Sequence, residues 1–153
     1  MNNKHHKIAI RTASIIILIA VFIFLIFTSI SIILYPGGTQ FNEHSKRFDF
    51  IDNFICDLLR SDALNGQSNQ ISSNLISIAM FIMIIAFIPF WIILPYFFEQ
   101  KNRIKRAVKF LGLFSVLGML AVPLTPSDRY GFLHGMVISL AAVPGISAAI
   151  IGG

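Results

Sequence analysis

Charged side chains are scarce in this chain: Asp, Glu, Lys and Arg make up 12% of its 153 residues, against 56% for hydrophobic residues. An ordinary soluble domain carries about 25% charged residues. The scarcity of charge, with a mean hydropathy of +0.77, excludes that class and indicates an integral membrane protein. The length allows one transmembrane domain, over residues 1–153, and no second domain.

Cysteine and diagnostic catalytic motifs are also nearly absent. Cys56 is the only cysteine, which excludes an intrachain disulfide, and we interpret it as a small core residue. The chain has no "HExxH" signature and no two histidines at i and i+4, the spacings typical of helical zinc sites. No internal repeat stands out. The sequence therefore contains no motif that names an enzyme, and no cofactor is predicted.

Long stretches almost free of charge are present instead. A bilayer core requires about 20 apolar residues per helix, and backbone polar groups in lipid have to be paired within their own segment. We therefore predict an all-α fold, an integral membrane four-helix bundle. The first span is too long for a signal peptide, whose apolar part runs about 7 to 15 residues, and is interpreted as a retained anchor. The spans are placed at residues 8–35, 71–98, 108–125 and 131–151.

Lysine and arginine are distributed unevenly about these spans. Eight of the twelve lie before or in the first turn of the first span, or between the second span and the first turn of the third. The positive-inside rule then places both termini and the loop 99–107 in the cytoplasm, with the loop 36–70 outside the cell (inner) membrane. Anionic lipid is the expected partner of the basic loop, because each cation near the surface contributes about 1 kcal/mol. The basic residues concerned are Lys101, Arg103, Lys105 and Arg106.

Nucleic acid is not an expected partner. The net charge of +5 would suit it, but the basic residues are mostly explained by orientation. No surface of interleaved basic and aromatic residues is found outside the spans.

The loop 36–70 carries five of the seven carboxylates. Its apolar residues recur at helical spacing with polar residues between them, which predicts an extracytoplasmic amphipathic helix between the first and second spans. Asp57 adjoins the apolar face of this helix and is the first functional candidate. Alternatively it pairs with Arg60, three residues on, or is solvated. The apolar positions are Ile51, Phe54, Ile55, Leu58 and Leu59.

A second polar cluster, "VPLTPSDRYGFLHG", separates the third and fourth spans. An ionisable residue inside a span is a functional candidate, although the inference weakens near an interface. Asp57, Asp128 and His134 are therefore catalytic candidates, and His44 and Glu43 could complete a zinc site with them. Because the spacing is not diagnostic, no catalytic or metal-binding residue is assigned. The favoured interpretation of His134 is an interhelical hydrogen bond.

Small residues recur every four positions in the fourth span. Such spacing lets helix backbones approach closely, so we predict a helix-packing surface there. Pro144 would kink this helix and could mark a substrate path, but close packing is the favoured interpretation. The predicted packing residues are Gly131, Gly135, Ala141, Gly145 and Ala149.

Three runs resemble a known family. "YPGG", "NFICDLLRSDALNGQSN" and "VPLTPSD" followed by His134 are similar to the small polytopic membrane proteins of the domain of unknown function 998 family. Members show a Ser-Asp-Leu-Gly run in the first outer loop; here Asp57 and Leu58 match it and Cys56 and Leu59 do not. The resemblance implies architecture, since the family has no settled activity. It implies about six spans, so we expect a shortened member, or two helices supplied by a partner or second copy.

The expected function is a non-enzymatic helical bundle or membrane-complex subunit that contacts lipid or partner helices, as a homo-oligomer or in a larger complex. The first alternative is a membrane-embedded, metal-dependent lipid hydrolase with an outward-facing site, motivated by the two polar clusters. The second is a small-solute carrier. Transport requires polar groups near the midplane, and beyond Ser and Thr the spans have almost none.

Overall fold

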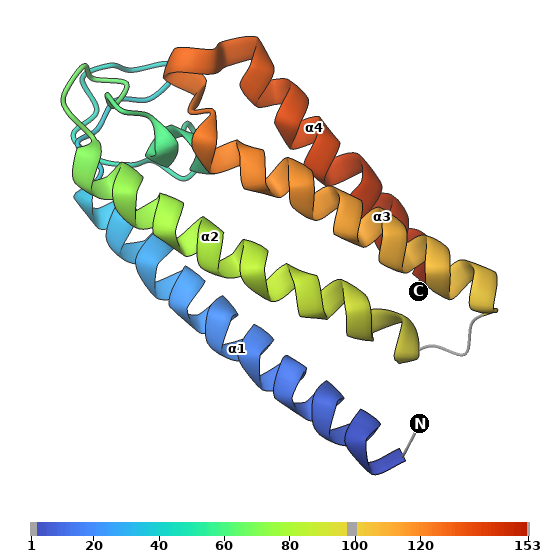
Figure 1. Ribbon diagram of the computed structural model, residues 1–153. Helices are drawn as coiled ribbons and strands as arrows, with labels where there is room; N and C mark the ends of the chain where they lie inside the picture. Colours follow the sequence, from blue (N-terminus) through green and yellow to red (C-terminus); the bar gives the residue numbers. More distant parts are fainter. Residues whose placement is uncertain (1–2, 98–100, 153) are drawn as a thin grey trace.

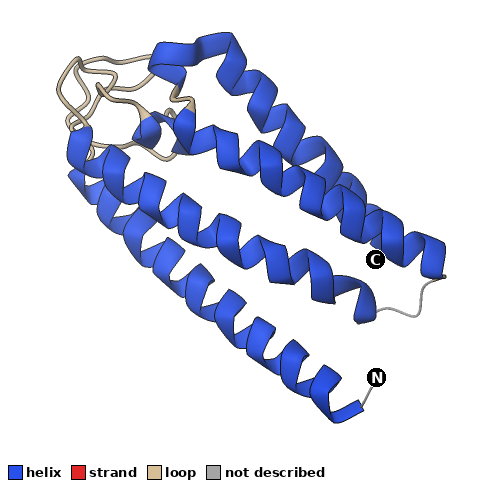
Figure 2. Cartoon of the chain, in the orientation of Figure 1, coloured by secondary structure: helices blue, strands red, loops and turns tan. Residues whose placement is uncertain are grey.

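The computed structural model describes residues 3–97 and 101–152, and this part of the chain is all-helical (Figure 1). Each of its four long helices is long and apolar enough to cross a membrane, which confirms the expected set of four potential spans. Figure 2 shows helices joined by loops; over the described ranges the only β-type pairing is an isolated bridge between Asp62 and Ser68. The long helices are α1 (Asn3–Leu34), α2 (Gln70–Ile93), α3 (Asn102–Ala121) and α4 (Ser127–Gly152).

Three short 3₁₀ turns accompany the long helices. η1 (Ile55–Leu59) lies in the loop between α1 and α2, η2 (Leu94–Tyr96) follows α2, and η3 (Val122–Leu124) follows α3. α3 begins at Asn102 rather than at residue 108, because its basic first turns consist of good helix formers and a helix need not end where lipid does. α4 begins at Ser127 rather than at residue 131, but its backbone is broken at Gly131, where φ is +34°.

The helices form two hairpins rather than a closed four-helix bundle. α1 packs along α2 and α3 packs along α4, whereas the contact between α2 and α3 is less extensive (Figure 1). α1 has at most minor contact with α3 and α4. In the most apolar stretch of α1, and likewise of α4, only 17% of the residues are buried. α1 and α4 are therefore the outer helices of a row, and most of their apolar surface is left for other molecules.

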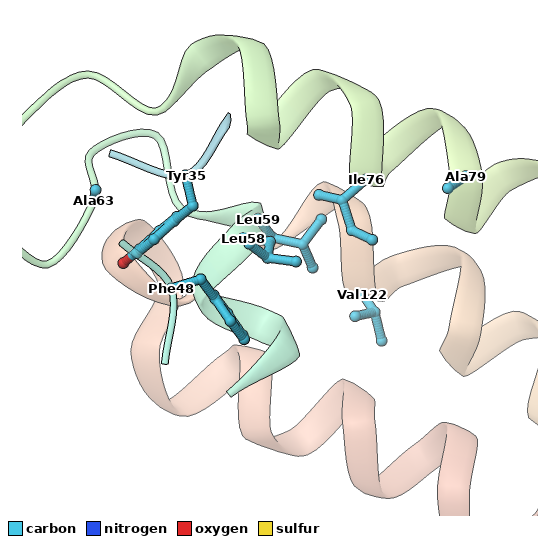
Figure 3. Packing of buried hydrophobic residues seen from close by; sticks show 8 residues of the cluster. All are labelled: Tyr35, Phe48, Leu58, Leu59, Ala63, Ile76, Ala79 and Val122. Carbon is cyan, nitrogen blue, oxygen red and sulfur yellow. The ribbon is translucent and has the colours of Figure 1, made fainter. Parts of the chain in front are cut away.

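The two ends of the row differ. At one end, here called the capped end, residues 35–69 fold over the helix termini; at the other, the basic end, α3 begins and both chain termini lie (Figure 1). The core of the capped end brings η1 against α2 and η3, with Leu58 and Leu59 pointing toward Ile76 and Val122 (Figure 3). A second core, toward the basic end, is built around Ile84, Trp91, Val108, Val116 and Ala148.

Small residues allow the close approach of the helices. A Cβ on Gly118 of α3 would lie 2.4 Å from the backbone nitrogen of Ala141 in α4, and a Cβ on Gly112 would lie 2.1 Å from the Trp91 ring of α2. Ser31 and Ser72 join α1 to α2 by donating to each other's carbonyl oxygens, both at 2.9 Å. Because these groups have no side chain or a short one, the backbones can come close enough for these contacts.

The amphipathic helix expected in the loop is not formed. Only the single turn η1 is helical, and Ile51 is 92% exposed and Phe54 69% exposed, so they do not share the buried face of Leu58. The reason is local competition for backbone groups. The Asp57 carboxylate accepts the N–H of Phe54 at 2.8 Å, and this is the N–H that a continuous helix would donate to the Phe50 carbonyl oxygen.

Candidate functional site

The capped end holds all the predicted catalytic candidates, and a glycine turn starts it. Gly37 and Gly38 follow α1 with φ of +123° and +84°, a region that favours glycine. A Cβ on Gly38 would lie 2.2 Å from the Asn65 backbone nitrogen, so the first and last segments of the loop are in contact there. Beside this contact, the Tyr35 hydroxyl accepts the N–H of Leu64 at 3.1 Å. Burial raises the pKa of Tyr35, which keeps this hydroxyl neutral.

Asp57 is buried and is bonded within its own turn. One carboxylate oxygen accepts the Phe54 N–H at 2.8 Å and lies 3.3 Å from the Asn53 side-chain nitrogen. The same Asn53 nitrogen donates to Gly38 O at 3.0 Å. Asp57 is therefore neither solvated nor placed by a pairing with Arg60, whose Nε donates to Asp62 O instead. Through Asn53, this carboxylate connects the turn η1 to the glycine turn.

Asn69 and Ser73 fasten the loop to α2. The Asn69 side-chain nitrogen donates to Leu58 O at 3.0 Å and to Arg60 O at 2.9 Å, and the Ser73 hydroxyl donates to Leu59 O at 2.9 Å. Neither Asn53 nor Asn69 was assigned a role of this kind from the sequence. The sequence does contain a signal for such bonds, because short polar side chains beside a turn compete for backbone groups. This signal does not identify the carbonyl groups to which the side chains donate.

Asp128 ties α4 to the loop. Its Oδ2 accepts the N–H of Ser61 at 2.9 Å across 67 residues of sequence. A carboxylate in the first turn of a helix also suits the positive end of the helix dipole. Its second oxygen, Oδ1, is buried with no hydrogen-bond partner among the described residues. The geometry therefore gives Asp128 a fastening role between α4 and the loop.

His134 is buried in α4 and faces the turn that precedes its own helix. Its Nδ1 lies 2.6 Å from Thr125 O, and since a carbonyl oxygen only accepts, Nδ1 carries the proton and donates. Nε2 is buried with no partner in the described part of the chain. His134 is thus a hydrogen-bonding residue, but its partner lies in the turn between α3 and α4 rather than in another helix, where the favoured interpretation placed it.

The candidate metal ligands are not brought together. Among residues 3–97 and 101–152, no three His, Cys, Asp or Glu side chains form a group that could hold a metal ion. His44 and Glu43 are exposed and line an open cleft with Lys46, whereas Asp57 is buried in η1. Asp128 and His134 are bonded to backbone groups of different segments. The arrangement fits a fastened cap better than a metal centre.

Cys56 lies half-buried next to Asp57 in η1. Burial, and after it the negative charge of Asp57, raises the pKa of the Cys56 thiol. A thiol with a raised pKa carries little thiolate at neutral pH and is a poor nucleophile. This geometry does not suggest nucleophilic catalysis at Cys56.

The predicted packing residues of α4 separate into two groups. Ala141 lies against Gly118, and a Cβ on Gly145 would lie 3.3 Å from the Ser115 hydroxyl, so both face α3. Gly131, Gly135 and Ala149 are exposed, and a Cβ on Gly135 would meet nothing within 4 Å. The close packing of α4 is therefore partly internal to the chain. The predicted basic residues lie at the start of α3, where Lys105 is half-buried and Lys101, Arg103 and Arg106 are exposed.

No protein-family model, curated protein or solved structure matches the chain. The carboxylate, amide and imidazole groups of the capped end bind backbone N–H and C=O groups at helix ends and turns. Such bonds hold a loop in place, because a buried polar group that loses its partner costs free energy.

Proposed function

We propose that this chain is a non-enzymatic subunit of a membrane complex, whose outer helices α1 and α4 contact lipid and the helices of a partner or of a second copy. The observation that carries the proposal is the open row of helices. α1 and α4 each pack along one helix of this chain, and large apolar side chains cover their remaining faces. Exposed examples are Leu18 and Phe22 on α1 and Val143 and Ile150 on α4.

The proposed orientation places the capped end outside the cell (inner) membrane and the basic end in the cytoplasm. Eight of the twelve cations belong to the basic end and its flanking termini, and six of the seven carboxylates to the capped end. Cations are retained on the cytoplasmic side during insertion. The resemblance to the domain of unknown function 998 family is part of the same proposal and rests on the three sequence runs.

The two alternatives receive no support from a specific observation. A metal-dependent hydrolase would use ligands that converge, and the described candidates are bonded to backbone groups instead. A solute carrier would use polar groups near the middle of the spans, whereas the Ser115 hydroxyl there donates to Gly112 O within its own helix. We therefore propose the subunit role alone.

The test is the mass of the purified chain in detergent and in nanodiscs, measured by light scattering with the lipid contribution subtracted. The expected result is a defined species heavier than one chain. Leu18→Trp on α1 or Val143→Trp on α4 is expected to shift this species toward the monomer, because both residues are exposed on outer helices. The control Ile85→Trp changes an equally exposed position of α2 and is expected to leave the mass unchanged.

The opposite result is equally clear. A monomer in both media, with a single cooperative unfolding transition, would overturn the subunit role. Loss of the heavier species in all three variants alike would show that it depends on general surface shape rather than on the outer helices.

A further inference from the structure

The basic end contains a groove that the roles described above do not use. It lies between the end of α2 and the first turns of α3 and has a volume of about 480 Å³, within the range of about 300 to 1,000 Å³ typical of small-ligand sites. Lys105, Arg106 and Lys109 line one side of it. We call it the basic groove.

The charges of the basic groove are not balanced by described carboxylates of the chain. Six of the seven acidic residues belong to the capped end, and the seventh, Glu99, lies outside the described residues. Asp128, the acidic residue nearest in sequence after α3, is bonded to Ser61 at the capped end. The first turn of α3 has neither an acidic residue nor a side-chain cap. Three cations beside a positive helix end favour an anionic ligand.

The opposite side of the groove is apolar. Ile92 and Pro95 line it together with Tyr96, and Phe97 beside it is 61% exposed. A ligand that fills the groove therefore meets cations on one side and hydrocarbon on the other. Arg binds phosphate oxygens in a bidentate manner and Lys binds them as a point charge. An anionic phospholipid combines both chemistries, whereas free phosphate satisfies only the basic side.

We propose that the basic groove binds the phosphate headgroup of an anionic phospholipid through Lys105, Arg106 and Lys109, with an acyl chain along Ile92. The proposal goes beyond a general attraction of the basic loop to the membrane surface, because it assigns binding to three of the five cations near the start of α3. Lys101 and Arg103 are exposed and do not line the groove. It rests on the proposed membrane location of the chain.

The experiment measures retention of phosphatidylglycerol by the detergent-solubilised chain, by native mass spectrometry and by titration with a fluorescent analogue. Lys105→Gln/Lys109→Gln is expected to weaken binding about 25-fold, from about fivefold for each cation lost. Lys101→Gln/Arg103→Gln removes the same charge from the same helix end and is expected to weaken it less than about threefold. Thermal unfolding of both variants establishes that they fold.

Equal weakening by the two double variants would overturn the proposal in favour of diffuse attraction, and no weakening by either would also overturn it. Inorganic phosphate provides the second arm. Displacement of the lipid by an equal concentration of inorganic phosphate would assign the groove to free phosphate and overturn the lipid assignment; the expected result is no displacement. The mass experiment tests the subunit role separately, because a monomer can still bind lipid in this groove.

Discussion

The capped end and the basic end of the molecule use their polar residues in opposite ways. At the capped end, buried side chains such as Asp57 and Asn69 bind backbone groups of the same chain at 2.8 to 3.0 Å. At the basic end, Lys105, Arg106 and Lys109 line a groove, and the described carboxylates lie at the far end of the helices. Polar residues serve the fold at one end and remain accessible to external anions at the other.

This difference shows that a concentration of ionisable residues is not by itself a site. The sequence made the carboxylates of the loop 36–70 the candidates for a functional site, because they lie between two uncharged stretches. Their backbone partners account for the buried ones, since a buried carboxylate needs such bonds. The cations, from which the membrane orientation was predicted, lie where no described carboxylate balances their charge. Four experiments test this comparison, from the largest expected effect to the smallest.

Gly38→Ala is expected to break the capped end completely. The new Cβ would lie 2.2 Å from the Asn65 backbone nitrogen at a φ of +84°, so both a clash and an unfavourable conformation oppose it, at more than about 4 kcal/mol. The measurement is the unfolding free energy in detergent by denaturant titration. Gly66→Ala is the control, because its φ is +78° and nothing lies within 4 Å; it is expected to cost about 1 kcal/mol. Similar losses in both variants would contradict the tight loop contact.

Gly112→Ala tests whether the half of the molecule toward the basic end is also closely packed. The added Cβ would lie 2.1 Å from the Trp91 ring, and overpacking of this kind costs about 1 to 3 kcal/mol. Trp91 is the only tryptophan, so its fluorescence spectrum reports the displacement. Gly135→Ala adds the same methyl group to an open position and is expected to be neutral or stabilising by up to about 1 kcal/mol. An unchanged Gly112→Ala spectrum and stability would show a loose contact between α2 and α3.

The sequence predicted the helices well because length and absence of charge determine them. It predicted the loop poorly because the outcome depends on partners distant in sequence, such as Ser61 for Asp128. The helical spacing from Ile51 to Leu59 is present in the sequence, but the Asp57 side chain accepts the Phe54 N–H that a continuous helix would need. The sequence shows the cations of the basic groove. It does not show that they lie beside Ile92 of α2.

His134→Ala is expected to destabilise the capped end by about 1 to 3 kcal/mol, because it leaves the Thr125 carbonyl without its buried donor. His134→Asn places an amide N–H near the position of Nδ1 and is expected to recover more than half of that loss. Unfolding free energies of the two variants and the parent decide it. Equal losses of stability in the two variants would mean that an amide cannot replace the imidazole. The hydrogen bond to Thr125 O would then not be the whole contribution of His134 to stability.

Cys56 gives the smallest expected effect and joins the comparison to the proposed orientation. Burial and the charge of Asp57 raise the pKa of this thiol above its ordinary value of 9.0, so less thiolate is present at any neutral pH and maleimide reacts slowly. The rate at which maleimide labels the folded chain should keep rising above pH 9.0, where the labelling rate of the detergent-unfolded chain approaches its plateau. Since Cys56 is the only cysteine, an impermeant maleimide added to intact cells should label it if the capped end is outside. Labelling that requires permeabilised cells would reverse the proposed orientation and place the basic groove in the outer leaflet. Coincident pH profiles of the labelling rate for the folded and unfolded chain would show that η1 does not shield the thiol.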